Sequence, residues 1–347
     1  MSLSTPAHSL MNHVRAGWNL GNTLDALRRD IPEGTIVPPG DAETAWGNPP
    51  VTRGLIRAVH DAGFDAVRLP VTWKQHLDHQ GVIDPPWLDR VEEIVQWILQ
   101  ENMVCLLNVH HDAGAHGWLQ ATGQCEADFG PRFDAIWTQI SQRFRHVGDH
   151  LVFEAFNEML DGQEHWTETS VPGAYEQHNA WNQRFVNIVR AGGDENLTRI
   201  LSVQTYSGGT SERTLDAFRC PGDAYGPGRI ILQVHNYDPQ GFCWRKAEGH
   251  ALRDTWGTED DLSEIDRLIS SLAAFSEKHR APVIIGEFGS EDKENTPERA
   301  RHADYITRKA CEHGIACFWW DCGHFAVMDR KKECVLHPSI VKALTLA

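Results

Sequence analysis

The sequence predicts an α/β fold, a single (β/α)8 (TIM) barrel with extended loops after its strands that form a cleft. Eight short apolar runs alternate with longer segments of helical period along the 347 residues. Runs such as 230–234 (IILQV) and 283–286 (VIIG) are almost wholly apolar, as in parallel strands that are buried on both faces. The first run leads into 17–23 (GWNLGNT), which does not fit the GxGxxG turn of a doubly wound open sheet.

Taken in chain order, the strands are short β-branched or apolar runs bounded by polar loops. We expect them to begin at Val14, Ala66, Met103, Leu151, Arg199, Arg229, Pro282 and Ile315. The expected helices carry apolar residues three and four positions apart, which gives each helix one face to cover the sheet. Their expected ranges are 52–62, 88–99, 131–147, 175–191, 211–218, 265–275, 297–313 and 338–346.

One catalytic domain over residues 1–347 accounts for this order, with residues 1–13 as an N-terminal extension. No linker rich in Ser, Thr or Pro divides the chain. A barrel of this kind needs only about 250 residues. We therefore expect the excess in long loops, notably 32–44 and 238–261, which follow the first and sixth strands.

The composition excludes several classes of partner. The chain has 32 Lys and Arg against 48 Asp and Glu, a net charge of −16, which disfavours nucleic acid and anionic membrane surfaces. No run approaches the roughly 20 apolar residues of a membrane-spanning helix. The eight cysteines lack CxxC spacing and are expected as free thiols. We expect a monomer, which is cytoplasmic if the chain is complete because its start lacks a signal-peptide pattern.

Polar residues gather where the expected strands end, and in a barrel these ends meet at one mouth. Alternation along a strand places Ile285 and Glu287 on one face, and likewise Phe156 and Glu158. We therefore expect Glu287 to enter the mouth if Ile285 points inward. The segments are VRLP (67–70), NVHHD (108–112), EAFNE (154–158), QVHNYD (233–238), GEFG (286–289) and FWWD (318–321).

Glu158 and Glu287 end two different strands and could face each other across this mouth. Paired carboxyl groups are what glycoside hydrolysis requires, one to protonate the leaving oxygen and one to attack or to activate water. Glu154 is expected deeper in the barrel, paired with a cation such as Arg68. Asp161 is expected as a surface or loop residue.

A histidine cluster offers an alternative of another class, a metal-dependent hydrolase. Its members would be His110, His111, Asp112 and His116, joined by His235 and Asp238. Adjacent strand residues face opposite sides, so His110 and His111 should not converge unless the strand has already ended. Hydrogen bonding to a substrate or to a carboxylate is the favoured role. A non-catalytic carbohydrate-binding barrel is a third hypothesis, which would need one carboxyl group to be misplaced.

Eight motifs together resemble glycoside hydrolase family 5, the cellulase family of clan A, and they span residues 17 to 321 in the family's order. The first two resemble a branch with many bacterial endo-β-1,4-glucanases, lichenases and xyloglucanases. One departure is Cys322 after WWD, where the family usually has Asn. The motifs are GWNLGNTLDA (17–26), ETAWGNPPVT (43–52), GFDAVRLPVTW (63–73), LNVHHD (107–112), FEAFNEM (153–159), VHNYDP (234–239), IIGEFG (284–289) and FWWD (318–321).

The resemblance implies a (β/α)8 barrel that cleaves β-1,4-glucosidic bonds in cellulose, mixed-linkage glucan or xyloglucan. It also implies a retaining double displacement without metal or organic cofactor. A β-mannanase and an exo-acting β-glucosidase are the alternatives on the same fold. Members of this family are commonly secreted, in contrast to the expectation from the N-terminus.

Carried over residue by residue, the resemblance implies that Glu158 is the acid/base and Glu287 the nucleophile. Arg68 would hold the nucleophile ionised, and with a tyrosine hydroxyl it would keep the pKa of Glu287 low. His110 and Asn157 would contact the sugar in the central subsite. The remaining implied site residues are His235 and Tyr237 near the nucleophile, Trp320 as the stacking platform, and His111 and Asn22 in support; Trp46, Trp118 and Trp244 are further candidates for stacking.

Overall fold

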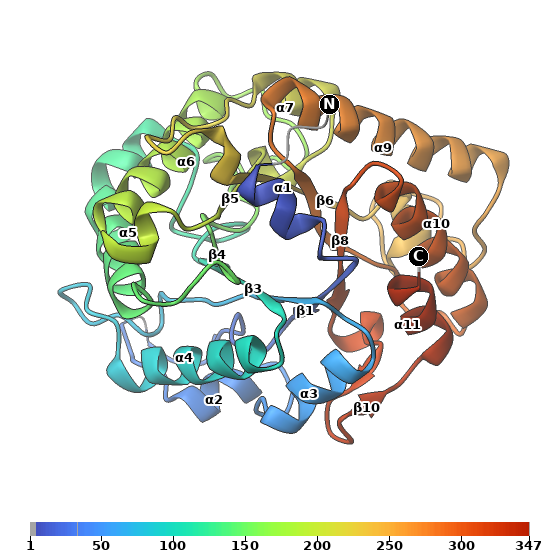
Figure 1. Ribbon diagram of the computed structural model, residues 1–347, viewed down its shortest axis with the longest axis horizontal. Coiled ribbons are helices and arrows are strands. Elements are labelled where there is room, and N and C mark those ends of the chain that lie inside the picture. Colours follow the sequence, from blue (N-terminus) through green and yellow to red (C-terminus); the bar gives the residue numbers. More distant parts are fainter. Residues whose placement is uncertain (1–4, 33, 347) are drawn as a thin grey trace.

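In the computed structural model, which describes residues 5–32 and 34–346, eight parallel strands close into a barrel in chain order. β1 (Ala16–Leu20) pairs with both β2 (Ala66–Leu69) and β8 (Ala316–Asp321), so the sheet has no free edge (Figure 1). The predicted barrel is confirmed, and each strand begins within two residues of its expected position. The others are β3 (Val104–Asn108), β4 (Leu151–Glu154), β5 (Leu201–Gln204), β6 (Ile230–Asn236) and β7 (Val283–Phe288).

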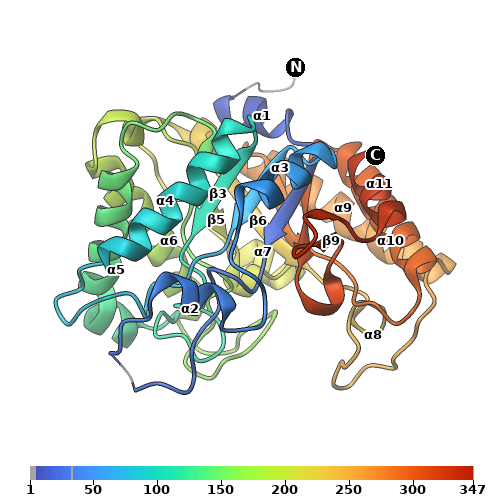
Figure 2. The same ribbon diagram turned by 90° about the horizontal axis from the view of Figure 1, so that it is seen from below.

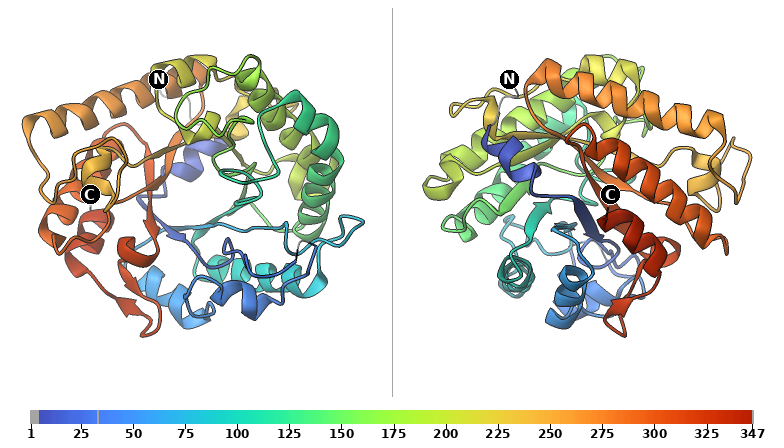
Figure 3. Two further views of the ribbon diagram at one scale, coloured as in Figure 1. Left: turned by 180° about the vertical axis from the view of Figure 1, so that it is seen from behind. Right: turned by 45° about the vertical axis from the view of Figure 1, so that its right-hand side comes forward.

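A ring of helices surrounds the barrel, as the views from two further sides show (Figure 3). The expected start at Pro131 is wrong, because Thr122 caps a helix that begins at Gly123 and contains the proline. The helices after the strands are α3 (Arg53–Asp61), α4 (Pro85–Gln100), α5 (Gly123–Arg143), α6 (Ala174–Ala191), α7 (Glu212–Ala217), α9 (Glu259–His279), α10 (Thr296–Cys311) and α11 (Pro338–Thr345).

The long loops at the carboxyl ends of the strands contain small elements of their own. α2 (Pro39–Thr44) lies in the loop after β1, and α8 (Gln240–Cys243) follows β6. A hairpin of β9 (Met328–Asp329) and β10 (Cys334–Val335) follows β8. Figure 2 shows α2 and α8 at the same end of the barrel. Each described helix is too short or too polar to cross a bilayer.

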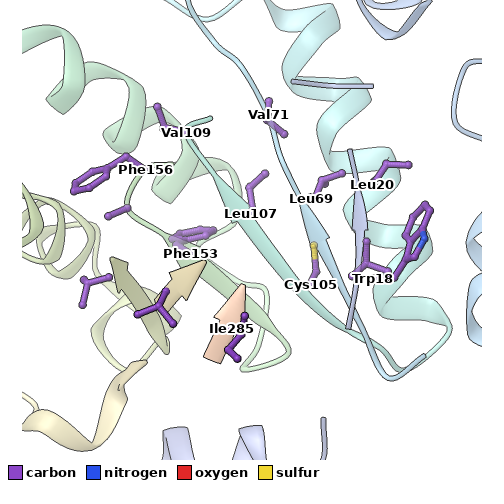
Figure 4. Packing of buried hydrophobic residues seen from close by; sticks show 14 of the residues in the cluster. Trp18, Leu20, Leu69, Val71, Cys105, Leu107, Val109, Phe153, Phe156 and Ile285 are labelled. Atoms are coloured by element: carbon purple, nitrogen blue, oxygen red, sulfur yellow. The ribbon is translucent and has the colours of Figure 1, made fainter. Parts of the chain in front are cut away.

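Hydrophobic residues of the strands pack in two layers. Alternate residues such as Trp18, Leu20 and Leu69 face the helices, and Figure 4 shows part of this outer layer. The intervening residues, such as Leu106 and Phe318, fill the inside of the barrel. Full burial of such side chains stabilises the fold by about 1.5–3 kcal/mol each.

Part of the expected N-terminal extension belongs to the core. The short helix α1 (Pro6–Met11) places Ala7, Leu10 and Met11 against the residues that fill the barrel. Figure 2 shows α1 at the end of the barrel opposite to the long loops. Residues 1–4 of that extension lie outside the described residues.

Two parity expectations are wrong. Ile285 packs with the outer layer, not inside the barrel, and the pairing of β7 with β8 shifts register between Ile285 and Phe288. This irregularity lets Glu287 reach the mouth although Ile285 faces outward. Phe156 also packs in the outer layer, because β4 ends at Glu154 and the alternation stops there.

Candidate active site

The two glutamates singled out in the sequence meet at the carboxyl end of the barrel. Glu287 lies in β7 and Glu158 in the loop after β4. One carboxyl oxygen of Glu158, one carboxyl oxygen of Glu287 and one ring nitrogen of His235 all lie within 4.8 Å of one another. The structure thus brings together residues that are 129 positions apart in the chain.

Arg68 of β2 is a buried hub beneath this pair. Its Nε and Nη2 donate to the two oxygens of Glu154, each at 2.7 Å, so the expected pairing of these residues is present. Its Nη1 donates to Oε1 of Glu287 at 2.5 Å, and Nη2 donates to Oδ1 of Asn157 at 2.9 Å. Asn19 of β1, which the sequence analysis missed, accepts a further bond from Nη1 at 3.0 Å. A planar guanidinium shared in this way fixes the position of Glu287.

Glu287 is bound at both oxygens, because the Tyr237 hydroxyl donates to Oε2 at 2.9 Å. Burial raises the pKa of Glu287, while the Arg68 guanidinium opposes the rise. The expectation of a low pKa is therefore wrong in its net direction, since desolvation outweighs the cation. Burial beside Glu287 also raises the pKa of Tyr237 well above its ordinary value, so its hydroxyl keeps its proton.

Glu158 has a less enclosed setting than Glu287. Its backbone has φ of 38°, a left-handed conformation that is uncommon for a residue with a side chain. Its N–H donates to Oε1 of Gln204 at 2.5 Å, which holds this turn. Oε1 of Glu158 lies 2.7 Å from Nδ1 of His235, and Oε2 lies 3.5 Å from Nδ2 of the Asn157 side chain.

His110 and His111 converge, which the sequence allowed only if the strand had already ended. β3 ends at Asn108, so both residues lie beyond the strand, and their ring centroids are 4.5 Å apart. Their Nε2 atoms lie 4.0 and 3.6 Å from Oδ2 of the buried Asp25. The other expected members are elsewhere: Asp112 accepts from the indole of Trp118 at 2.7 Å, and the exposed His116 pairs with Glu164 at 3.4 Å.

The hydrogen bonds of His110 argue against a metal in this cluster. The N–H of Val71 donates to Oδ1 of Asn108, so the amide nitrogen of Asn108 is the atom 3.1 Å from Nδ1 of His110. Nδ1 therefore accepts, and the ring proton is on Nε2, the atom that faces Asp25. A histidine that binds a metal through one ring nitrogen usually donates the N–H of the other to an acceptor. In His110, the other nitrogen, Nδ1, faces a donor instead. Burial holds the pKa of His110 well below its usual value, so Nε2–H is a neutral donor into the mouth.

Trp320 at the end of β8 forms one side of the mouth. Its ring lies parallel to that of His110, with centroids 5.8 Å apart and planes 7° apart. A Cβ at position 21 would lie 2.7 Å from this indole, so only glycine lets the end of β1 approach it. Cys322, the departure from the family pattern, accepts a hydrogen bond from Nε1 of Trp320 at 3.0 Å.

Trp244 and Asn22 differ in their relation to the mouth. Trp244 packs against Tyr237 with ring centroids 4.8 Å apart, and both rings pack against the cluster that contains Trp320. Asn22 has φ of 57° in the loop after β1, and its backbone carbonyl accepts from the Asn48 amide at 2.7 Å. The described contacts thus place the backbone of Asn22, and not its side chain, in the framework of the site.

A cleft of about 1540 Å³ leads away from Glu158 and is also lined by Asn157 and His111. Trp46 and Trp118 line it as expected, and Trp166, which the sequence did not single out, lines it too. The sequence pattern gives no sign of Trp166, because the shape of its loop depends on hydrogen bonds to Asp161. That aspartate lies in a loop, one of its two expected places, but it is fully buried and accepts hydrogen bonds from Gln163, His165 and Thr169.

The barrel, with two carboxyl groups that face each other across its mouth, has the arrangement of a glycoside hydrolase. The family model described as "Cellulase (glycosyl hydrolase family 5)" matches residues 32–326, and the chain belongs to this family. Among curated relatives, Endoglucanase A of Clostridium longisporum is 35% identical over 91% of this chain and 59% of its own length. Cellulase/esterase CelE of Acetivibrio thermocellus is also 35% identical, over 97% of this chain and 40% of that protein. The chain thus spans only part of these two relatives.

Solved structures show the same architecture over the whole chain. A lichenase of this family from Caldicellulosiruptor sp. F32 has a TM-score of 0.90 at 33% identity, covering 100% of this chain and 96% of that one. PbGH5A from Prevotella bryantii B14, solved as a mutant in complex with a xyloglucan tetradecasaccharide, has a TM-score of 0.88 at 32% identity, covering 98% and 97% of the two chains.

Proposed function

We propose that this protein is a retaining, endo-acting hydrolase of β-1,4-glucosidic bonds in β-glucans, with Glu287 as nucleophile and Glu158 as acid/base. The separation of the two carboxyl groups carries the proposal. Their nearest oxygens lie within 4.8 Å. Retaining enzymes hold these groups about 5–5.5 Å apart, whereas inverting enzymes need about 6.5–9.5 Å to admit a water molecule.

In the first step, Oε2 of Glu158 gives its proton to the glycosidic oxygen as the bond from that oxygen to the anomeric carbon breaks. A carboxylate oxygen of Glu287 forms a new bond to the same carbon, which leaves a glycosyl ester and a free sugar hydroxyl. In the second step, Glu158 takes a proton from water, and the water oxygen displaces Glu287. Two inversions at one carbon give net retention.

The surroundings of each carboxyl group support this division of roles. Arg68 and Tyr237 hold the two oxygens of Glu287 and stabilise its ionised form, which is the form that attacks. Among the described residues, the donor reported for Oε2 of Glu158 is the side-chain amide of Asn157, at the long distance of 3.5 Å. This oxygen can therefore exchange a proton with the leaving group and with water. Neutral His110 can donate Nε2–H to a sugar hydroxyl.

The choice of β-glucan rests on the relatives and on the shape of the cleft. The similar proteins carry the names endoglucanase and lichenase, and one is bound to a xyloglucan fragment. A cleft of about 1540 Å³ lined by three tryptophans suits a run of sugar rings, which stack their apolar faces on indoles. Such a cleft accepts the middle of a polymer and favours endo action.

The test is hydrolysis of carboxymethylcellulose, barley β-glucan and xyloglucan by the wild type and by Glu287→Ala and Glu158→Gln. We expect an early fall in viscosity with wild type, and a loss of about three orders of magnitude or more in each variant. Mannan and aryl β-glucoside arms reveal a β-mannanase or an exo-acting enzyme. Equal activity of wild type and Glu287→Ala would exclude the assigned nucleophile.

Metal removal separates this proposal from the metal-dependent alternative. We expect full activity on barley β-glucan after exhaustive chelation, because both steps use only carboxyl groups and water. Activity that disappears with chelation and returns with added Zn²⁺ would favour the alternative instead.

A further inference from the structure

His235 of β6 is the side chain that lies between the two proposed catalytic carboxyl groups. Its Nδ1 is 2.7 Å from Oε1 of Glu158 and 3.8 Å from Oε2 of Glu287. Its other ring nitrogen, Nε2, lies 3.0 Å from the amide nitrogen of Gln204 and 3.1 Å from that of Gln233. Both glutamines are fully buried, and the proposed mechanism gives neither a role.

A backbone donor fixes which end of the Gln204 amide faces the histidine. The N–H of Glu158 points at one amide atom at 2.5 Å, and because a backbone N–H can only donate, that atom is Oε1. The NH2 group of Gln204 must then face Nε2 of His235. The Ser202 hydroxyl donates to Oε1 of Gln233 at 3.0 Å, which turns the second NH2 group the same way.

Two glycines leave space for Gln233 and His235. A Cβ on Gly286, the residue before Glu287, would lie 2.5 Å from Cδ of Gln233. A Cβ on Gly208 would lie 3.1 Å from Cγ of His235. The GE pair of the GEFG motif thus serves two purposes, because its glycine makes space for the amide below the histidine.

A ring nitrogen that faces two N–H donors carries its lone pair and no proton. We infer that Gln204 and Gln233 are positioning residues that hold His235 as the neutral Nδ1–H tautomer, so that its one proton is donated to Oε1 of Glu158. A second proton on Nε2 would point at two NH2 groups. The inference rests on the proposed role of Glu158, and it adds the device that orients this residue.

The device has two consequences for the acid/base. Because Oε1 receives Nδ1–H, the proton that Glu158 exchanges is confined to Oε2. Because the ring stays neutral, it supports the carboxylate that follows proton transfer less strongly than an imidazolium would. An imidazolium at His235 would favour ionisation of Glu158, so that Glu158 would lose its proton before the leaving group could take it.

The groups near the His235 ring have opposite effects on its protonation. Two carboxyl groups favour an imidazolium, whereas the nearby guanidinium and the two NH2 groups disfavour it. Tyr237 keeps its proton and adds no charge. The carboxyl groups that contact the ring are those of Glu158 after β4 and Glu287 of β7. Arg68 of β2 and Tyr237 after β6 contact Glu287, and His110 after β3 is near enough for a coulombic effect.

Nitrogen-15 NMR of the histidine-labelled wild type tests the inference, with the His235 signals identified by their absence in His235→Asn. At the pH at which activity is measured, we expect a protonated Nδ1 and an unprotonated Nε2. A protonated Nε2 at this pH would overturn the inference. This readout needs no activity, so a chain inactive on β-glucans would refute the proposed function and leave the tautomer as found.

Gln204→Glu provides the second measurement, since it keeps an acceptor for the Glu158 N–H and replaces the NH2 group by an acceptor. We expect Nε2 to become protonated and the alkaline limb of kcat/KM to move down by about one pH unit. Gln100→Glu, an exposed position at the end of α4, adds the same charge and should leave both readouts unchanged. A Gln204→Glu protein with an unprotonated Nε2 and an unmoved alkaline limb would contradict the inference.

Discussion

Glu287 and Glu158 are the same residue type at two strand ends, and their neighbours give them different properties. The side chain of Glu287 is 6% exposed and bound at both oxygens. The side chain of Glu158 is 19% exposed and has one strong partner, His235. The fixed group suits attack on a carbon atom, and the freer one suits proton exchange with a leaving group and with water.

The raised pKa of Glu287 predicts the acid limb of the pH profile. The nucleophile must be ionised, so activity is lost as the pH falls through this pKa. We expect the acid limb of kcat/KM above about pH 4.5, the ordinary range of a glutamate. Tyr237→Phe removes a donor to the ionised form and should move this limb up by about one pH unit.

Rates on barley β-glucan across the pH range check this prediction. Tyr225→Phe is the control, because Tyr225 is 46% exposed and lies in the loop before β6. An acid limb that is identical in wild type and Tyr237→Phe would show that this hydroxyl does not stabilise the ionised nucleophile.

At the scale of elements, the hairpin after β8 holds together two strand ends of the site. Arg330 of this hairpin is buried and donates to the carbonyl of Gly21 at 2.8 Å and to the Thr23 hydroxyl at 2.7 Å. It also pairs with Asp321 at 3.0 Å, directly after Trp320. The hairpin thus fixes the loop after β1 against the indole at the mouth.

Arg330→Met should therefore destabilise the protein strongly. Asp321 would keep a buried charge without its partner, and such a loss costs about 3–5 kcal/mol. Urea denaturation measures the change. The control is Lys332→Met in the same hairpin, because its exposed pair with Asp329 should contribute little to the free energy of unfolding. Similar losses in both variants would refute the role of Arg330.

The loop after β4 presents Trp166, which is 49% exposed, to the cleft. Trp166→Ala should raise KM for β-glucan about two- to tenfold, because an aromatic contact of this kind contributes about 0.5–1.5 kcal/mol. Hydrolysis of a short aryl cellobioside should change little. Trp166→Phe keeps a stacking face and serves as control. An unchanged KM for the polymer in Trp166→Ala would remove Trp166 from the binding surface.

The sequence predicted what depends on local pattern and on the geometry of parallel strands. Glu158, Glu287 and Arg68 could be found because the carboxyl ends of parallel strands share one mouth. The side-chain amides of Gln233 and Asn19 could also have been recognised from the sequence. Gln233 shares the parity of His235 in an otherwise apolar strand, and Asn19 is polar within buried β1.

Other features depend on irregular backbone or on distant contacts. The outward position of Ile285 follows from a register shift that no alternation rule contains. The convergence of His110 and His111 required knowledge of where β3 ends. Trp166 and Arg330 are placed by loops whose shape depends on contacts far along the chain, such as that between Arg330 and Gly21.

For the whole molecule, the net charge of −16 sets how polymers approach the cleft. An acidic protein repels carboxymethylcellulose at low ionic strength and has no such interaction with a neutral glucan. We expect kcat/KM on carboxymethylcellulose to rise several-fold as salt increases from about 0.01 M to about 0.2 M, because the Debye length shortens. Barley β-glucan is the neutral control and should show no change. A fall on carboxymethylcellulose with added salt would contradict this electrostatic account.

The central claim is that substitution at the anomeric carbon occurs twice, first by Glu287 and then by water. Proton NMR of the first products from barley β-glucan, recorded before mutarotation, tests it most directly. The account predicts that the new reducing end appears as the β-anomer and converts slowly to the equilibrium mixture. An α-anomer as the first product would mean a single inversion, and it would contradict the assignment of Glu287 as nucleophile.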